Sequence, residues 1–439
     1  MLTRRTLPLI SALVLSSSLA FAQSDVPPVA PEAPVDQAPV PEAPPPAPMA
    51  PTPPPPPPVV APSAVPMGAS IATSTAIAPS QSSFKIEAPN GSSVKLGVLL
   101  QPQYQMQGST SLSGYAQNLY IRRTRFLIGG TLFGVIDYFM ETDYPNLFLA
   151  SNSTNATTGA VTSVKATPGN NIQDAFVTVH PWGDVFKVDA GYMLPPMAHN
   201  AVQGAGTLYS WDYFSNSFLS TANTDLGSSA SPVGRDAGAE LRGLVVGGLV
   251  EYRLGLFQGL RNAPTATDVG SRNFFRVTGR LQINLLDPET GFFYAGTYLG
   301  AKKIFSLGGA FDIQGTYHYY AGDVFVDLPT GPGVFTGQVN FVYENGGTDI
   351  PALPKQMAVM SEIGYNFAGA RVSPILRIEE NWNKSNPAMT TTIGRYGGGI
   401  GWWPYGHNSN LKLFYTMVRE TGEVHALNQV NLQWQVYFY

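Results

Sequence analysis

The stretch from Tyr120 to Tyr144 reads YIRRTRFLIGGTLFGVIDYFMETDY and contains two runs of alternating side chains. In the first run Phe126 and Ile128 share one side, while Arg123 and Arg125 share the other. In the second run apolar and aromatic side chains alternate with three carboxylates. Strict alternation predicts strands whose two faces meet different environments. The rest of the chain decides whether the charged face lies on the outside or the inside of the sheet.

The composition favours a membrane β-barrel. Only 12% of the 439 residues are charged, against about a quarter in ordinary soluble domains. After the first 22 residues, no segment approaches the apolar length of a membrane-spanning helix. A low-charge, aromatic-rich chain without such a segment is typical of a transmembrane β-barrel. The net charge of −4 gives no reason to expect a nucleic-acid partner. The absence of Cys excludes disulfides, Cys-ligated zinc and thiol catalysis.

The N-terminal region carries an export signal and a spacer. Residues 1–22 combine Arg4 and Arg5 with an apolar stretch and an Ala-Phe-Ala cleavage site, which predicts a signal peptide. Residues 23–92 are predicted to be a Pro/Ala-rich disordered periplasmic spacer, because residues 26–66 hold nineteen of the 38 prolines. This segment could instead contact the cell wall or an inner-membrane partner.

Alternation continues from Val94 to the C-terminus and predicts sixteen strands. We expect Gly129 to Gly134 to form a tight turn, Asn146 to Asn171 to form a polar loop and Lys384 to Met389 to form a longer joint. Three strands lie between Val94 and Tyr144, and the pattern is clearest at Asn273–Leu286. The other predicted strands are Ile172–His180, Val185–Leu194, Gly234–Val245, Leu249–Leu260, Lys302–Thr316, Tyr317–Leu328, Val334–Asn345, Gln356–Phe367, Ala370–Asn381, Thr391–Trp403, Asn410–Glu420 and Glu423–Tyr439.

The predicted fold is an all-β, 16-stranded antiparallel transmembrane barrel over residues 93–439. Lipid offers no hydrogen-bond partner to an open sheet edge, so the barrel must close. An even strand number places both barrel ends at one rim, on the periplasmic side. In the last strand Trp434 and Phe438 face lipid, and alternation turns Tyr439 to the other face.

Several ordered motifs resemble the phosphate-selective porin O and P family. They include IRRTRFLIGGTLFGVIDYFMETDY, IQDAFVTVHPWGDVFKVDAGYMLPP, GRDAGAEL and GRYGGGIGWWPYGHNSNLKLFYT, within residues 93–439. The resemblance implies a sixteen-stranded homotrimeric channel in the outer membrane, with a pore lined by basic residues and narrowed by inward loops. The matching arginines are Arg122, Arg123 and Arg125. By alternation Arg122 faces lipid unless it lies at a rim or in a bulge, and we expect a rim position. Pro195–Val233 is the candidate constriction loop.

The charge count of the inward face argues against a strongly selective pore. Alternation places twelve basic and twelve acidic side chains there, whereas a phosphate channel needs an excess of Arg and Lys. We therefore expect passive diffusion of small hydrophilic solutes or ions, with at most a modest anion preference. Cross-strand ion pairs could account for many of these charges. The predicted pore-lining residues are Lys95, Arg123, Arg125, Asp137, Glu141, Lys187, Arg242, Arg253, Arg276, Arg280 and Arg377.

Other functions find little support in the sequence. The five histidines show no metal-ligand spacing, and no constellation of Ser, His and carboxylate suggests an enzyme. We expect no cofactor and no metal. The remaining alternative is a structural anchor of the outer membrane, in which the proline-rich segment tethers the envelope. The expected partners are outer-membrane lipid and small solutes.

Overall fold

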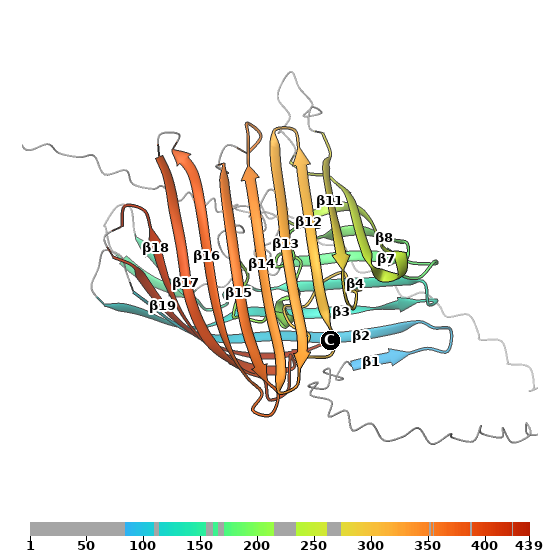
Figure 1. The fold of residues 1–439 in the computed structure, drawn as a ribbon, viewed down its shortest axis with the longest axis horizontal. Coiled ribbons are helices and arrows are strands. Elements are labelled where there is room, and N and C mark those ends of the chain that lie inside the picture. Colours follow the sequence, from blue (N-terminus) through green and yellow to red (C-terminus); the bar gives the residue numbers. More distant parts are fainter. Residues whose placement is uncertain are drawn as a thin grey trace, which may run out of the picture. The chain divides into compact units, whose positions relative to one another are not determined.

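The computed structural model describes residues 84–108, 114–154, 161–165, 171–214, 234–260, 274–350, 353, 355–386, 389–423 and 425–439. Strands make up almost all of the regular structure (Figure 1). No helix in these ranges is long and apolar enough to cross a membrane. The strands are β1 (Phe84–Glu87), β2 (Ser93–Gly108), β3 (Tyr115–Leu132), β4 (Ile136–Asp143), β5 (Ala150–Thr154), β6 (Val161–Lys165), β7 (Asn171–Val179), β8 (Lys187–Met193), β9 (Asp236–Val245), β10 (Val250–Phe257), β11 (Arg276–Asn284), β12 (Ile304–Gln314), β13 (Tyr317–Thr330), β14 (Gly333–Asn345), β15 (Gln356–Phe367), β16 (Val372–Asn386), β17 (Met389–Trp402), β18 (Ser409–Glu420) and β19 (Leu427–Phe438).

The sheet closes when β19 pairs antiparallel with β2, from Gln429 beside Gln107 to Phe438 beside Val98. The barrel therefore has sixteen antiparallel strands, as predicted, from β2 to β19 without the separate β5–β6 pair. Both ends of the barrel lie at one rim, which we call the terminal rim. The opposite loop rim carries the connections that follow β4, β8 and β10. Closure leaves no barrel strand without a neighbour on either side.

Strand β1 extends the sheet at the terminal rim. It pairs antiparallel with the first residues of β2, from Phe84 beside Leu96 to Glu87 beside Ser93. Because β19 ends opposite Val98, β1 occupies the stretch of the β2 edge that β19 does not reach. This strand lies within residues 23–92, the region for which the sequence predicts a disordered spacer.

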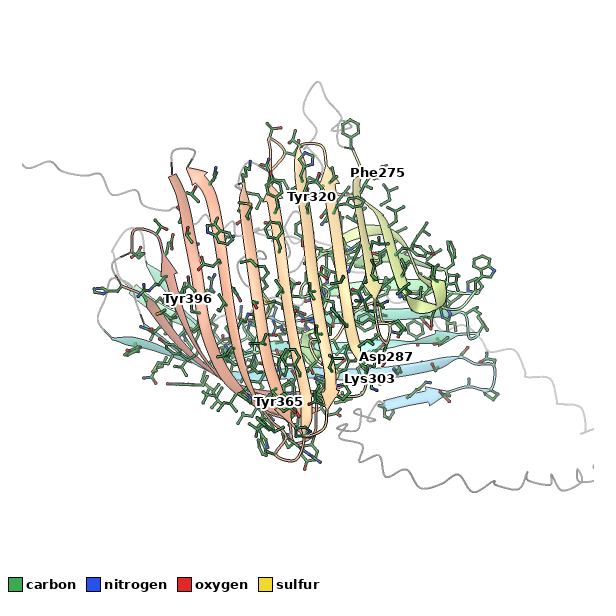
Figure 2. The ribbon with its side chains drawn as sticks, in the orientation of Figure 1. Phe275, Asp287, Lys303, Tyr320, Tyr365 and Tyr396 are labelled. Carbon is green, nitrogen blue, oxygen red and sulfur yellow. The ribbon has the colours of Figure 1, made fainter. Side chains whose placement is uncertain are left out.

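The outer face of the barrel is apolar. Leu281 and Ile283 of β11 are among many large apolar side chains that are more than a third exposed there, and their neighbours Arg280 and Gln282 point inward and are buried. Aromatic residues lie toward both rims: Figure 2 shows Tyr320 near the loop rim and Tyr365 near the terminal rim. Such an apolar band with aromatic ends matches the lipid-facing surface of membrane barrels.

Three sequence predictions are corrected locally. The residues Gly129 and Gly130 lie inside β3, and the turn falls at Phe133 to Val135. The predicted loop from Asn146 to Asn171 contains the two-stranded sheet of β5 and β6. The joint expected from Lys384 to Met389 is short, because β16 and β17 continue to Asn386 and Met389. In each case residue types that are common in turns and loops occur within a paired backbone.

A bulge in β3 changes the orientation of Arg122. Leu100 pairs with Thr124 and Pro102 pairs with Ile121, so Arg122 and Arg123 together face the single residue between them on β2. A two-to-one bulge shifts the alternation by one residue. Both arginines consequently reach inward and contact Asp212. The expected rim position of Arg122 is therefore replaced by a position in a bulge.

The depth of the lipid contact is testable by placing a charge on the outer face. Leu281→Arg in the middle of β11 should lower the free energy of unfolding by about 2–4 kcal/mol in a bilayer, because a charge near the midplane loses its hydration. Leu285→Arg, on the same face at the terminal rim, should cost about 0–1 kcal/mol. Urea unfolding of the barrel in lipid vesicles measures both. Equal costs at the two depths would contradict the proposed placement of the band.

Candidate functional site: the barrel lumen

Two segments fold into the lumen from opposite rims. The first inner segment, residues 195–214, enters from the loop rim and belongs to the connection between β8 and β9. Its backbone is held by side chains of the wall: Asn340 accepts from the amide of Asn200 at 2.9 Å, and Lys412 donates to the carbonyls of Leu208 and Ser210 at 2.7 and 2.9 Å. Because an irregular backbone inside a barrel must find polar partners, these contacts explain how the segment stays in the lumen. The inward position agrees with the prediction for this part of Pro195–Val233, and residues 215–233 lie outside the described ranges.

The connection from β11 to β12 turns into the lumen at the terminal rim, and we call its residues 288–302 the second inner segment. Figure 2 shows Asp287 and Lys303 together at its base, where the carboxylate of Asp287 accepts from the amide of Lys303 at 2.8 Å. Farther in, Arg253 donates to the carbonyls of Gly291 and Phe292. Strand alternation does not predict that this segment lies inside the barrel. The cluster Phe292-Phe293-Tyr294 is the signal in the sequence, because three consecutive aromatic residues do not fit the two faces of an alternating strand.

The two inner segments are joined to each other. The amide of Tyr294 donates to the carbonyl of Val202, and its carbonyl accepts from the amide of Gly204, at 3.0 and 2.9 Å. The ring of His199 bridges to the carboxylate of Glu289 at 2.9 Å. At Gly296 a β-carbon would lie 2.7 Å from a backbone nitrogen of the first inner segment, so only glycine permits this approach. The lumen therefore contains one connected internal layer and not two independent loops.

The lumen wall is lined with ion pairs. Arg125 of β3 contacts Glu141 and Asp143 of β4, each at 3.2 Å, and Arg276 of β11 contacts Asp312 of β12 at 2.5 Å. Guanidinium groups suit such contacts because they donate several hydrogen bonds in one plane. Further pairs are Arg235–Asp174, Arg242–Asp189, Arg253–Glu251, Arg280–Asp323 and Arg377–Glu379. The structure thus favours the expectation that many lumen charges serve as ion pairs.

The Arg280–Asp323 pair crosses an intervening strand. Arg280 lies on β11 and Asp323 on β13, and their side chains meet at 2.7 Å above β12. A β-carbon at Gly308 of β12 would lie 2.2 Å from the carboxylate and 2.3 Å from the guanidinium. A side chain at this position would displace the carboxylate or the guanidinium from the pair. Asp323 also accepts from the amide of His199, which ties the pair to the first inner segment.

Of two cavities in the lumen, the larger has a volume of about 310 Å³. It lies between the inner segments and the wall formed by β2, β3, β4 and β19. Its charged lining consists of Arg125, Glu141, Arg235 and Lys302. Several aromatic rings complete the lining, namely Phe139, Tyr213, Phe293, Tyr294, Tyr298, Tyr437 and Tyr439. The presence of Tyr439 confirms that the last residue faces the lumen, where its ring also packs against Phe139 at 5.5 Å between centroids.

A smaller cavity of about 170 Å³ lies toward the loop rim, against β16, β17, β18 and β19. Its charged lining consists of Asp212, Arg377, Glu379 and Arg395. The neutral members include Trp211, Tyr213 and Gln429. The two cavities therefore follow one another along the same side of the lumen, with the first inner segment between them.

The predicted pore-lining residues fall into three groups. Arg125, Glu141 and Arg377 line one of these two cavities, and Arg123 contacts the first inner segment through Asp212. The second group is buried on the opposite wall, beneath or beside the inner segments, and lines neither cavity: Arg242, Arg253, Arg276 and Arg280. The third group lies at the terminal rim: Lys95, Asp137 and Lys187.

Within the described ranges, no three His, Asp or Glu side chains come together as metal ligands. His407 lies in the turn between β17 and β18, where burial lowers its pKa to about 4. Its ring is therefore neutral at pH 7, and Nε2 lies 2.9 Å from the carbonyl of Thr297 in the second inner segment. This contact gives the histidine a structural role.

No protein-family model matches the chain, and no curated protein matches it. The resemblance to the phosphate-selective porin O and P family is therefore not confirmed. Solved structures of outer-membrane porins are similar in fold. The OmpF porin of Salmonella typhi, solved in complex with daunomycin, has a TM-score of 0.51 at 11% identity, over 81% of this chain and 100% of that one.

Other porins align at lower scores. The outer-membrane channel DcaP of Acinetobacter baumannii has a TM-score of 0.46 at 11% identity, over 80% of this chain and 99% of that one. A BenF-like porin from Pseudomonas fluorescens has a TM-score of 0.42 at 10% identity, over 79% and 98%. At these identities the likeness extends to the fold. The chain has the fold of an outer-membrane porin.

Proposed function

We propose that the protein is a porin of the outer membrane, through which small hydrophilic solutes and ions diffuse passively. The observation that carries this proposal is the pair of cavities in a polar, ion-paired lumen, enclosed by a barrel with an apolar outer face. A polar interior within a lipid-facing sheet is the arrangement of water-filled membrane barrels. The porin fold of similar structures supports the same function.

A modest anion preference follows from the distribution of charge. Basic and acidic residues are equal in number over the whole predicted inward face. They are not equal in number in the lining of the two cavities. The larger cavity is lined by three basic residues and one acidic residue, and the smaller by two of each. A pore lined by an excess of one sign concentrates ions of the other. The described lining therefore favours anions slightly.

A specific phosphate site has less support. Arg125 and Arg377 line the cavities, but their guanidinium groups already contact the carboxylates Glu141, Asp143 and Glu379. An oxyanion would have to compete with these fixed carboxylates for the same donors. We therefore propose a general anion preference and not selectivity for phosphate.

The direct test is ion conduction by the purified full-length chain in a planar lipid bilayer. We expect stepwise single-channel currents. A variant lacking residues 26–66, which lie outside the described ranges, should conduct equally well, because the barrel closes without them. A barrel that inserts but carries no current would overturn the porin. If the deletion preserved insertion and removed only an envelope phenotype, the structural anchor would gain support.

Lys302 offers a test of the anion preference with a matched control. It lines the larger cavity and donates to the carbonyl of Pro288 at 3.0 Å, whereas the adjacent Lys303 is exposed and lines neither cavity. Lys302→Gln should reduce the permeability of chloride relative to potassium, because it removes one positive charge from the passage. Lys303→Gln should leave the ratio unchanged. Reversal potentials in a KCl gradient measure both, and equal values for the two variants would contradict the assignment of this cavity to the ion path.

We also propose that the chain forms a homotrimer and that its N-terminal segment lies in the periplasm. The mass of the detergent-solubilised barrel tests the first point. Protease accessibility of the N-terminal segment in intact and permeabilised cells tests the second.

A further inference from the structure

Tyr213 lines both cavities, and no other residue that the structure describes does so. Tyr213 is only 7% exposed, so it is packed by its neighbours where the two cavities approach each other. Pore width and the groups that line it set the size limit of a channel.

The position of Tyr213 is fixed from several directions. Its hydroxyl donates to the carbonyl of Gln203 at 2.8 Å, which connects the end of the first inner segment to its middle. The guanidinium of Arg123 lies 5.3 Å from the centre of the ring, within the range of a cation–π contact. These two contacts restrain the ring.

The preceding residue anchors this part of the segment to the barrel wall. One oxygen of Asp212 contacts Arg123 at 2.6 Å and the other contacts Arg122 at 3.0 Å. Both arginines can reach the same carboxylate because the β3 bulge turns them both inward. Asp212 also accepts from the amide of Tyr213 at 2.9 Å, so the clamped carboxylate orients the next residue directly.

We propose that Tyr213 is the size filter of the passage, and that the β3 bulge holds it in place through Asp212. This inference rests on the proposed porin function and assigns the specificity for solute size to one side chain. The filter acts on neutral and charged solutes alike. Its effect can therefore be separated from the anion preference by using uncharged sugars and polyols of increasing size.

The filter is tested by truncating the ring. Tyr213→Ala should join the two cavities, raise single-channel conductance by about twofold or more, and admit larger neutral solutes in liposome swelling. Tyr213→Phe keeps the ring and should retain the wild-type size limit. Tyr209→Ala is the matched control, because Tyr209 lies on the same segment, stacks near Trp403 and lines neither cavity. Circular dichroism verifies that each variant is folded.

An unchanged conductance and size limit in Tyr213→Ala would overturn the filter, as would an equal increase in Tyr209→Ala. The proposal that Tyr213 is the size filter and the proposal that the protein is a porin can be rejected independently. A wild-type barrel that carries no current while Tyr213→Ala conducts would reject the open porin and retain Tyr213 as the barrier.

The anchoring role of the bulge is tested with Asp212→Ala. We expect larger fluctuations of the open-channel current and a size limit between those of the wild type and Tyr213→Ala, because the ring loses its fixed position. Arg122→Gln should act in the same direction with less disturbance, since Arg123 keeps its contact with Asp212. Asp184→Ala, which removes an exposed carboxylate at the terminal rim, is the control. Current noise and size limits like those of the control would overturn the anchoring role.

Discussion

The pairing of β19 with β2 is the constraint on which the rest of the structure depends. Each backbone amide and carbonyl in a lipid-facing sheet needs a partner, and only closure supplies partners to the first and last strands. The register from Gln429–Gln107 to Phe438–Val98 brings the C-terminus to the rim where the barrel begins. Closure also separates the lumen of the barrel from its outer face. Because side chains alternate along each strand, the polar residues point into this lumen, from which lipid is excluded.

That confined space explains the ion pairs and the internal layer. A buried arginine without a partner is costly, so the lumen pairs its arginines with carboxylates on the same or nearby strands. The inner segments then cover one wall, where Arg276 and Arg280 are buried. The two cavities lie on the other side, against β2 to β4 and β16 to β19. Balanced charge over the whole barrel is thus compatible with a slight excess of positive charge in the lining of these two cavities.

The sequence predicted the barrel well because strand alternation is a local signal that sixteen strands repeat. It predicted the faces of Arg123, Arg125 and Tyr439 for the same reason. The orientation of Arg122 could not be predicted in this way. It depends on a bulge, and a bulge is set by the register with a neighbouring strand, which strand alternation does not reveal. The second inner segment was missed because its contacts, such as Tyr294 with Val202, join residues far apart in the chain. The cavity lining depends on these long-range contacts, which is why several predicted pore residues proved to lie on the covered wall.

Strand β1 bears on how the barrel would respond to mechanical load. Its four residues pair with β2 from Ser93 to Leu96, whereas the seam with β19 begins at Val98. Tension applied to the chain ahead of Phe84 would therefore act first on the β1 pairing. The four-residue pairing of β1 with β2 would therefore break before the force reached the pairing of β19 with β2. The barrel could lose β1 and keep its sixteen strands closed, so a pull on the preceding chain need not open the membrane to leakage.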